Sequence, residues 1–382
     1  MYELKLRADG DTNPNKVDLG VGIYRNEQGL YHELRALKDA KDRLAATNPN
    51  HDYEVTTGNA EYLGNAARIA FGNNSNILES GQVASVQTIS GTGSIHIALM
   101  FLSRSVEGLE KTVYVGTPTW GNYQPMCAIA GLSFQPYRHY SPETGRVDWK
   151  SVLDAVRGAA PGSIFILQAC CHNPTAADFS QDQWKTLAKE MKDRCLFPLF
   201  DMAYQGLGNG LDEDVFGLRH FAQEGFELLA CQTFSKSFVQ VASAVHDQLR
   251  FLIRSEFSSS PAYGARLVNT ILSDPQRELI WREELNTLHQ RLRALRGKLF
   301  HLLHDVHKTP GNWEVITRGT GLFSLLPLTI EQCKALQTKY HIYLVPNGRI
   351  TVSGLNERNI EYVALSIDEV VRASETPIRN HI

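Results

Sequence analysis

Short apolar runs alternate with stretches of helical periodicity between residues 83 and 235, and this alternation restricts the fold more than any other feature of the chain. Strands that alternate with helices form βαβ units, in which parallel strands are covered by helices on both faces. A helix over 181–192 is expected after Ser180, a favourable N-cap, and another helix follows Gly93. Strands are expected at 83–89, 112–115, 163–169, 196–200 and 227–231. The middle of the chain is therefore predicted to be one doubly wound α/β unit.

The pattern changes after Pro275, which indicates a second unit of structure. A charged, leucine-punctuated stretch runs from there to about His304 without a helix breaker and is predicted to be one long helix. We expect a large domain of residues 32–287 and a small α+β domain formed by 1–31 with 288–382. Its elements are expected to be a strand at 321–326, a helix at 330–340, a hairpin over 342–353 that turns at 346–348, and a final helix at 359–371.

The composition excludes several classes of protein. The 38 Lys and Arg residues are balanced by 41 Asp and Glu residues, which leaves a net charge of −3 and no broad basic field for nucleic acid. No apolar run approaches the roughly 18 residues that cross a bilayer, so we expect no membrane partner. Six cysteines without a CxxC pair or metal-ligand spacing indicate reduced thiols and no metal. The cytoplasm is the expected location, or the mitochondrion if an N-terminal leader is missing.

Polar residues follow every predicted strand of the central unit. In an open α/β sheet, ligands bind beyond the carboxyl ends of the strands. The segments at these ends are Ser90-Gly91-Thr92-Gly93, Thr117-Pro118-Thr119-Trp120, Cys171-His172-Asn173-Pro174, Asp201-Met202-Ala203-Tyr204 and Thr233-Phe234-Ser235-Lys236. Together they predict a cofactor site at this edge of the sheet.

Three of these positions suit a phosphorylated ring cofactor, and each also has a purely structural reading. Ser90 to Gly93 joins a strand to a helix start, where free N–H groups bind phosphate, or is a tight turn that needs glycine. Asp201 ends an apolar strand and would stay ionised beside a protonated pyridinium nitrogen, or it caps a turn. Lys236 lies between two phenylalanines, where a desolvated amine bonds covalently to a carbonyl, or it is a solvated surface group. The chain lacks the GxGxxG fingerprint of dinucleotide sites.

Three further residues remain open between two roles. Trp120 either lies flat against a cofactor ring or fills the core. Asn173 precedes Pro174, which is first of all a turn signal. Arg349 shares a strand face with Thr351, and it is either a surface group or a clamp for a carboxylate.

Eight ordered segments spread over nearly the whole chain identify a family resemblance. They are LGVGIYRNEQG, SGTGSIHIA, PTWGNY, CHNPTAAD, QWKTLAKEMKDRCLFPLFDMAYQG, FELLACQTFSKSF, SSSPAYGAR with LSDP, and NGRITVSGLNERN. The sequence resembles aspartate aminotransferases, which are class I aminotransferases of the pyridoxal-phosphate fold type I group. The resemblance implies an α/β fold with a large domain around a mostly parallel central sheet, a smaller α+β domain, and pyridoxal 5'-phosphate as the cofactor.

The resemblance also assigns roles to individual residues. Lys236, Asp201 and Tyr204 form the implied catalytic set: Lys236 binds the cofactor covalently and moves the proton, and Asp201 holds the ring nitrogen. The implied cofactor contacts are Ser90, Gly91, Thr92, Trp120, Asn173, Asp201, Tyr204, Thr233 and Lys236, with Tyr53 reaching the phosphate from a second subunit. The implied substrate contacts are Gly22, Trp120, Asn173, Arg254 and Arg349.

The paired arginines imply a dicarboxylic substrate. Arg349 would bind the α-carboxylate, and Arg254 would bind the side-chain carboxylate across a homodimer interface with shared active sites. The implied reaction is ping-pong transfer of an amino group between L-aspartate and 2-oxoglutarate, giving oxaloacetate and L-glutamate. The partners are therefore expected to be dicarboxylic amino acids, 2-oxo acids and a second copy of the chain.

The sequence departs from the family pattern after Lys236. A turn, a phosphate-binding arginine and a strand are expected to be missing, with Ala244 at the position of the arginine and Arg250 as the nearest cation in sequence. Tyr123 and Gln168 each stand where the family usually has a histidine. His96 replaces an arginine, and Ala176 replaces a glycine. Two alternatives to an aspartate aminotransferase therefore stay open: a weak or inactive relative that acts as a dimer partner, and an aminotransferase with a different amino-acid specificity.

Overall fold

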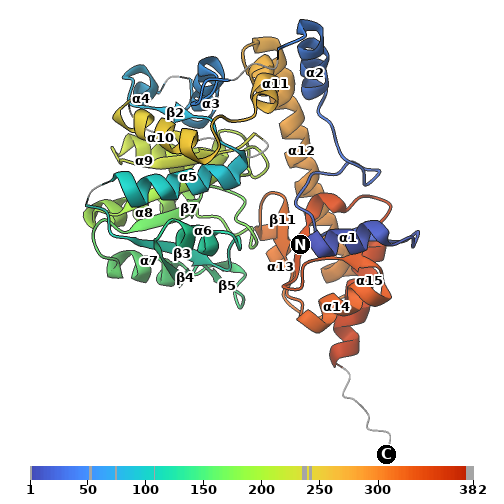
Figure 1. Cartoon of the computed structure of the whole chain (residues 1–382). Helices are drawn as coiled ribbons and strands as arrows, with labels where there is room; N and C mark the ends of the chain where they lie inside the picture. The colour runs from blue at the N-terminus through green and yellow to red at the C-terminus, as the bar shows by residue number, and fades with distance from the viewer. Residues whose placement is uncertain are drawn as a thin grey trace, which may run out of the picture.

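A seven-stranded sheet covered by helices forms the larger part of the protein, and a smaller α+β part lies beside it (Figure 1). The computed structural model describes residues 2–50, 54–73, 75–106, 108–234, 239–240 and 243–375. No helix in this part of the chain is long and apolar enough to cross a membrane.

The central sheet has the strand order β2-β10-β9-β8-β7-β3-β4. Its strands are β2 (Ser85–Val86), β3 (Thr112–Thr117), β4 (Ser133–Arg138), β7 (Ile164–Gln168), β8 (Phe197–Met202), β9 (Leu229–Gln232) and β10 (Val239–Gln240). The five neighbours from β9 to β4 run parallel, and β10 runs antiparallel between β9 and β2. The five predicted strands are all present, although the first is reduced to two residues.

Two strands differ from the prediction. β4 was not expected, because it carries Pro136 and a mostly exposed pattern, both of which are tolerated only at a sheet edge. The strand expected to be missing after Lys236 is present as the two residues Val239 and Gln240, which pair with Cys231 and Ala230 on one side and with Val86 and Ser85 on the other. The prediction of a lost strand was therefore wrong, because two residues suffice to bridge the neighbouring edges.

Helices cover both faces of this sheet and explain its continuous apolar strands. On β7, Ile164 and Ile166 belong to one apolar cluster, and Phe165 and Leu167 belong to another on the opposite face. One face carries α5 (Ser90–Ser105), α6 (Tyr123–Ile129) and α10 (Ser243–Glu256). The other carries α7 (Trp149–Gly158), α8 (Gln181–Asp193) and α9 (Phe216–Gln223), preceded by the 3₁₀ turn Glu213–Val215. Ser180 caps α8 with a reciprocal capping box to Gln183, as predicted from the sequence.

The long helix α12 (Pro275–His301) connects the two parts of the molecule (Figure 1). Asp274 caps its start by accepting two backbone N–H bonds, and a π turn at Leu302–Val306 continues it close to the predicted end. Its first half packs against α2 (Arg35–Thr47) and α11 (Ala262–Leu272), and its second half packs against α13 (Glu314–Arg318) and α15 (Ile360–Glu375). The remaining helices of the larger part are α3 (Ala60–Phe71) and α4 (Asn76–Glu79).

The smaller part is built on its own apolar cluster, which includes Leu292, Phe323, Ile350 and Val363. Its elements are α1 (Tyr2–Gly10), β1 (Val17–Asp18), β11 (Phe323–Leu325), α14 (Ile330–Lys339), β12 (Ile342–Tyr343), β13 (Arg349–Thr351) and the 3₁₀ turn Val352–Gly354. A further pair, β5 (Tyr140–Ser141) with β6 (Arg146–Val147), forms a short hairpin of the larger part. The division at residues 31/32 and 287/288 stays a prediction.

The predicted hairpin over 342–353 was wrong. β12 pairs in parallel with β1, whereas β13 pairs antiparallel with β11, so the two segments belong to different sheets. The turn between them exists, and Gly348 has a φ of 84° with its Cα packed against the backbone carbonyl of Leu326, where a side chain would collide. This arrangement places Arg349 beside Phe323 instead of leaving it on a free hairpin.

Candidate active site

A pocket opens at the carboxyl ends of the parallel strands, where the sequence predicted it. The walls come from the start of α5, the loop before α6, the ends of β7 and β8, and the loops that follow them. The lining residues are Gly91, Thr92, Trp120, Tyr123, Gln168, Asn173, Asp201, Ala203 and Tyr204. Seven of these nine residues come from four of the five polar segments that follow the predicted strands; Tyr123 and Gln168 do not.

Asp201 supplies the carboxylate of the pocket from the end of β8. Its Oδ2 accepts a hydrogen bond of 2.5 Å from the hydroxyl of Tyr123. Tyr123 is only 1 % exposed, and burial, followed by the negative charge of Asp201, raises the pKa of its phenol well above the usual value. The phenol is therefore a permanent donor to the carboxylate, and the predicted catalytic aspartate has a partner that the sequence prediction had not assigned to it.

Asn173 is fixed between the two parts of the molecule. Its backbone N–H donates to Oε1 of Gln168 at 2.8 Å, and its side-chain Oδ1 accepts from Nη1 of Arg349 at 3.2 Å. Gln168 also donates to Oγ1 of Thr119 and to the carbonyl of Asn173, each at 3.4 Å. Gln168 thus holds the loop after β7 in place, so that the Asn173 amide faces the pocket and contacts Arg349.

Arg349 lies inside the protein, which rules out the surface alternative. It is 5 % exposed, its Nη2 donates to the carbonyl of Gly20 at 2.8 Å, and its guanidinium lies 4.5 Å from the ring centre of Phe323. Burial lowers the pKa of Arg349, yet a guanidinium keeps its charge in proteins. Its Nε is buried without a hydrogen-bond partner among the described residues. A buried cation with a free donor is a binding site for an anion such as a carboxylate.

The predicted substrate contact Gly22 lies against the same aromatic ring. A Cβ atom at Gly22 would come within 2.7 Å of the Phe323 ring, so only glycine permits this approach. The ring of Tyr204 packs edge-on against Phe323 on another side, with centroids 5.4 Å apart. Burial, followed by the charge of Asp201, raises the pKa of Tyr204. The Phe323 ring therefore contacts Gly22, Tyr204 and the guanidinium of Arg349.

The start of α5 forms the opposite end of the pocket. Ser90 has a φ of 59°, a left-handed conformation that is unusual for a residue other than glycine and that is concentrated at ligand-binding sites. Gly91 and Thr92 follow in the first turn, where free backbone N–H groups and the helix dipole favour a phosphate. At the end of β9, Oγ1 of Thr233 is buried without a partner among the described residues. These groups, called the α5 cradle below, are donors that suit an anionic ligand.

Several predicted site residues have other outcomes. Lys236 and Tyr53 lie outside the described residues. Arg254 is on the exposed side of α10, where it donates to the hydroxyl of Ser258. Ala244 is the second residue of α10, and Arg250 forms an ion pair with Asp247 on that helix at 3.1 Å. The substitute cation considered for the missing arginine is thus engaged elsewhere.

Two buried histidines support the pocket from below. The rings of His139 and His172 stack with centroids 4.0 Å apart, and Nε2 of His139 donates to the carbonyl of Ala177. Nδ1 of His172 is 2.8 Å from Oγ1 of Thr175. Burial lowers the pKa of both imidazoles, so both are neutral at neutral pH. They act as a neutral packing layer.

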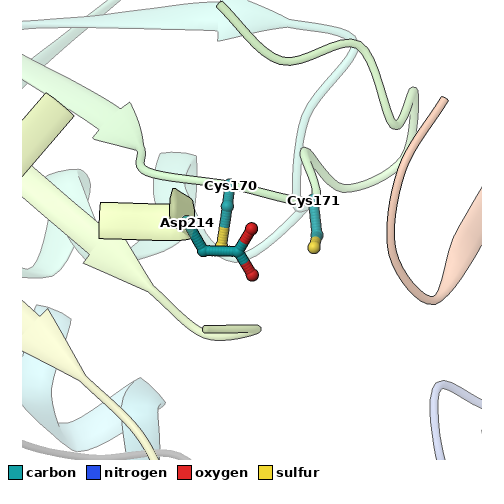
Figure 2. A group of neighbouring side chains, drawn as sticks. All are labelled: Cys170, Cys171 and Asp214. Atoms are coloured by element: carbon teal, nitrogen blue, oxygen red, sulfur yellow. The ribbon is translucent and has the colours of Figure 1, made fainter. Parts of the chain in front are cut away.

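A buried group of Cys170, Cys171 and Asp214 brings potential metal ligands together, although the sequence showed no metal-ligand spacing (Figure 2). The contact with Cys171, followed by burial, raises the pKa of the Cys170 thiol. The contact with Cys170 lowers the pKa of the Cys171 thiol, but burial has the opposite effect, and the pKa is raised to about 11. Both thiols therefore keep their protons when no metal is bound, and metal binding would require their loss. The Asp214 carboxylate already accepts bonds of 2.7 to 2.9 Å from the backbone N–H groups of Gly206, Gly208 and Asn209. This group is explained as an anchor for the loop after β8.

Taken together, the groups in and around the pocket fit a single kind of ligand. The indole of Trp120 provides an aromatic wall, Asp201 provides a negative charge for a ring cation, and the α5 cradle provides donors for an anionic group. At the far side, Arg349 provides a positive charge for a second anion. A flat, protonated, phosphorylated ring with a carboxylate-bearing reactant beside it satisfies all of these groups.

Comparison with known proteins agrees with this geometry. The pattern of the family described as "Aminotransferase class I and II" matches residues 14–367. Aminotransferase tasG of Hapsidospora irregularis is 44 % identical over 389 residues, which cover 98 % of this chain and 93 % of that protein. Cytoplasmic aspartate aminotransferase of Saccharomyces cerevisiae has a structure that superimposes with a TM-score of 0.93 at 35 % identity, covering 97 % of this chain and 96 % of that one.

A second solved structure extends the comparison to another substrate class. Aromatic-amino-acid aminotransferase of Burkholderia pseudomallei, whose structure holds covalently bound pyridoxal phosphate, superimposes with a TM-score of 0.93 at 32 % identity and covers 97 % of this chain and 96 % of that one. The α/β fold expected from the resemblance, fold type I with a mostly parallel sheet, is confirmed by these superpositions. The chain therefore belongs to the class I and II aminotransferases and is similar to aspartate aminotransferases.

Proposed function

We propose that this chain is a pyridoxal-phosphate-dependent aminotransferase that transfers the amino group of L-aspartate to 2-oxoglutarate, giving oxaloacetate and L-glutamate. The observation that carries the proposal is the buried guanidinium of Arg349, held between Asn173 and the ring of Phe323 next to the pocket. Two of its five N–H donors are used in the bonds described above, so its planar fork can still bind a carboxylate. A reactant with an α-carboxylate is the ligand that this group recognises.

The residues around the pocket suit the cofactor. When bound, pyridoxal phosphate supplies an electron sink for the negative charge that develops at the substrate Cα. Asp201 would hold the protonated ring nitrogen, Tyr204 and Asn173 would hold the ring oxygen, and Trp120 would stack on the ring. Ser90, Gly91, Thr92 and Thr233 surround the phosphate. Lys236 would bond covalently to the cofactor and would carry the proton that leaves the substrate Cα.

The phosphate end is weaker than in the family pattern, because Ala244 stands where an arginine is expected. A hydrogen bond to a charged group contributes about 1.5–3 kcal/mol, so its loss weakens cofactor binding by about tenfold to a hundredfold. The helix start and the two threonines keep the neutral part of the cradle. The covalent bond to Lys236 offsets part of the lost affinity.

The second carboxylate of the substrate requires a second cation. Arg254 lies exposed on α10, where it donates to Ser258, and in a homodimer with shared active sites it would bind this carboxylate across the interface. Tyr53 contributes to the phosphate site from the partner in the same arrangement. The cytoplasmic location stays a prediction.

A substrate panel tests the proposal. We would measure kcat/KM of the purified protein, saturated with pyridoxal phosphate, for L-aspartate, L-glutamate, L-phenylalanine and L-tyrosine with 2-oxoglutarate as acceptor. The proposal predicts that L-aspartate is preferred over the aromatic amino acids by at least tenfold, about 1.4 kcal/mol of transition-state binding. A preference for an aromatic amino acid would assign a different specificity, and the lack of turnover with every substrate would identify an inactive relative. The Lys236→Ala variant is the blank for every substrate in this assay.

A further inference from the structure

The short contact between Tyr123 and Asp201 points to a role for a residue that the sequence noted only as a departure from the family pattern. Tyr123 opens α6, 78 residues before Asp201, and its hydroxyl reaches Oδ2 of the carboxylate at 2.5 Å. A bond of this length lies at the short end for a neutral donor on an ionised oxygen. The side chain of Tyr123 is buried, and both Tyr123 and Asp201 line the pocket.

The position of the phenol is fixed independently of this bond. The ring of Tyr123 packs edge-on against Trp120 at a centroid distance of 5.2 Å, and it borders both the pocket and the layer that contains His139 and His172. Gln168, in register with Asp201 on the neighbouring strand β7, supports the loop after β7 from the same layer. The hydroxyl therefore presents a rigid donor to Asp201.

The groups that face Asp201 from each neighbouring element keep one protonation state around neutral pH. On β9, Cys231 stands in register with Asp201, and burial raises the pKa of its thiol. On the loop after β8, burial raises the pKa of Tyr204. On β7, Gln168 does not titrate, and the histidines beneath it are held neutral by burial. From the smaller part, Arg349 stays charged.

We propose that Tyr123 is a positioning residue: through the hydrogen bond that its hydroxyl donates, it orients Asp201 and keeps the carboxylate ionised for the ring nitrogen of the cofactor. This inference rests on the proposed function. No proton is transferred: the O–H of Tyr123 remains a donor to Asp201, and the ring nitrogen of the cofactor would be a further donor to the same carboxylate. A donor to the ionised form stabilises that form, so the phenol extends the pH range in which Asp201 carries its charge.

Binding of pyridoxamine 5'-phosphate tests the role apart from catalysis, because this form of the cofactor lacks the aldehyde that bonds to lysine. Its dissociation constant is measured by quenching of tryptophan fluorescence for the wild type and for Tyr123→Phe, Asp201→Asn and the double variant. Tyr137→Phe is the matched control, since Tyr137 lies on β4 with its ring against Phe165 and also borders the layer beneath the pocket.

The expected results follow from the strength of a charge-assisted hydrogen bond. Tyr123→Phe should weaken binding by about tenfold or more, and Tyr137→Phe by less than about twofold. In the Asp201→Asn background, removing the phenol should have no further effect, since Tyr123 acts through the charge of Asp201. Cofactor affinity, plotted against pH, should fall on the acid side, and this acid limb should lie about one pH unit higher in Tyr123→Phe than in the wild type. The ionisations of the ligand affect both plots equally and cancel in the comparison.

Two outcomes would overturn the inference: equal binding by Tyr123→Phe and Tyr137→Phe, or an undiminished effect of Tyr123→Phe in the Asp201→Asn background. If Tyr123→Phe does not fold, 3-fluorotyrosine at position 123 replaces it. This more acidic phenol should move the acid limb to lower pH, and an unchanged limb would reject the role. Failure of the wild type to bind either form of the cofactor would instead reject the proposed function, so the two claims fail separately.

Discussion

Replacing Arg349 by lysine separates a carboxylate clamp from a packing residue. The change keeps the positive charge but removes the planar fork that donates to Asn173 Oδ1 and to the carbonyl of Gly20. A lysine ammonium still attracts a carboxylate, yet it binds with one point contact where the guanidinium binds with two parallel N–H donors. The first expected consequence is a loss of substrate affinity, and the second is a small loss of stability.

The magnitude follows from the number of bonds lost. One charge-assisted hydrogen bond to the substrate contributes about 1.5–3 kcal/mol, so kcat/KM for L-aspartate should fall by about tenfold to a hundredfold in Arg349→Lys. The two lost bonds inside the protein contribute roughly 1 kcal/mol each to the free energy of unfolding, partly recovered by the lysine. Asn173, whose side chain Arg349 contacts, also lines the pocket, so the dissociation constant of pyridoxamine 5'-phosphate should rise, but by less than kcat/KM falls.

The assay couples oxaloacetate formation to malate dehydrogenase and follows NADH consumption at varied L-aspartate. Arg293→Lys, on the exposed side of α12, is the matched control for an arginine-to-lysine change. A loss of kcat/KM below about threefold, under 0.7 kcal/mol, would refute the assignment of Arg349 to the substrate carboxylate. A large loss accompanied by an equal loss of cofactor affinity would show that Arg349 acts through the structure of the pocket.

Three further changes test other parts of the account. Thr233→Val should leave the free energy of unfolding of the apo protein, measured by chemical denaturation, unchanged or raised, because Oγ1 is buried without a partner among the described residues. The same change should weaken cofactor binding, measured by fluorescence titration, by about tenfold. The folded-state pKa of His172 lies below its unfolded value, so the contribution of His172 to stability is complete above about pH 6.5 and is lost as the pH falls below that value. In this lower pH range, His172→Phe should reduce the slope of unfolding free energy against pH by up to about 1.4 kcal/mol per pH unit. Ala176 has a φ of 56°, so Ala176→Gly should raise the free energy of unfolding by about 0.5–1 kcal/mol, and an unchanged or lower thermal midpoint would contradict the strain.

The central sheet could be predicted because its strands carry a local signal. The run from Ile164 to Leu167 is apolar on both faces, and Asp201 ends a similar run, so both the strands and the polar residues at their ends are visible in the sequence. β4 lacked this signal, because an edge strand with Pro136 reads like a loop.

Contacts between distant segments could not be predicted. The bonds from Tyr123 to Asp201 and from Arg349 to Asn173 join residues 78 and 176 positions apart, and no local pattern records such pairs. The hairpin prediction failed for the same reason: the turn at 346–348 is local, whereas the choice of β1 and β11 as strand partners is made by the packing of the smaller part. The burial of Arg349 between Phe323 and Asn173 is visible only when that packing is known.

The departures from the family pattern acquire a physical meaning in the structure. Tyr123 contacts Asp201 directly, Gln168 holds the backbone of Asn173, and His96 contacts Glu256 on α10 at 3.3 Å. Ala176 adopts the left-handed conformation that explains why a glycine is usual at this position. Tyr123 and Gln168 line the pocket, whereas the loss of the phosphate-binding arginine stays a prediction.

The absorbance spectrum of the purified protein with pyridoxal phosphate, recorded before and after addition of L-aspartate, tests the central claim most directly. The account predicts the band of lysine-bound cofactor, followed by its conversion to the pyridoxamine form when the amino acid is added. This result would show that the cradle at α5 binds the phosphate without the missing arginine and that the first half-reaction proceeds. A spectrum of free cofactor that L-aspartate does not change would contradict the claim and identify the chain as a non-catalytic member of the family.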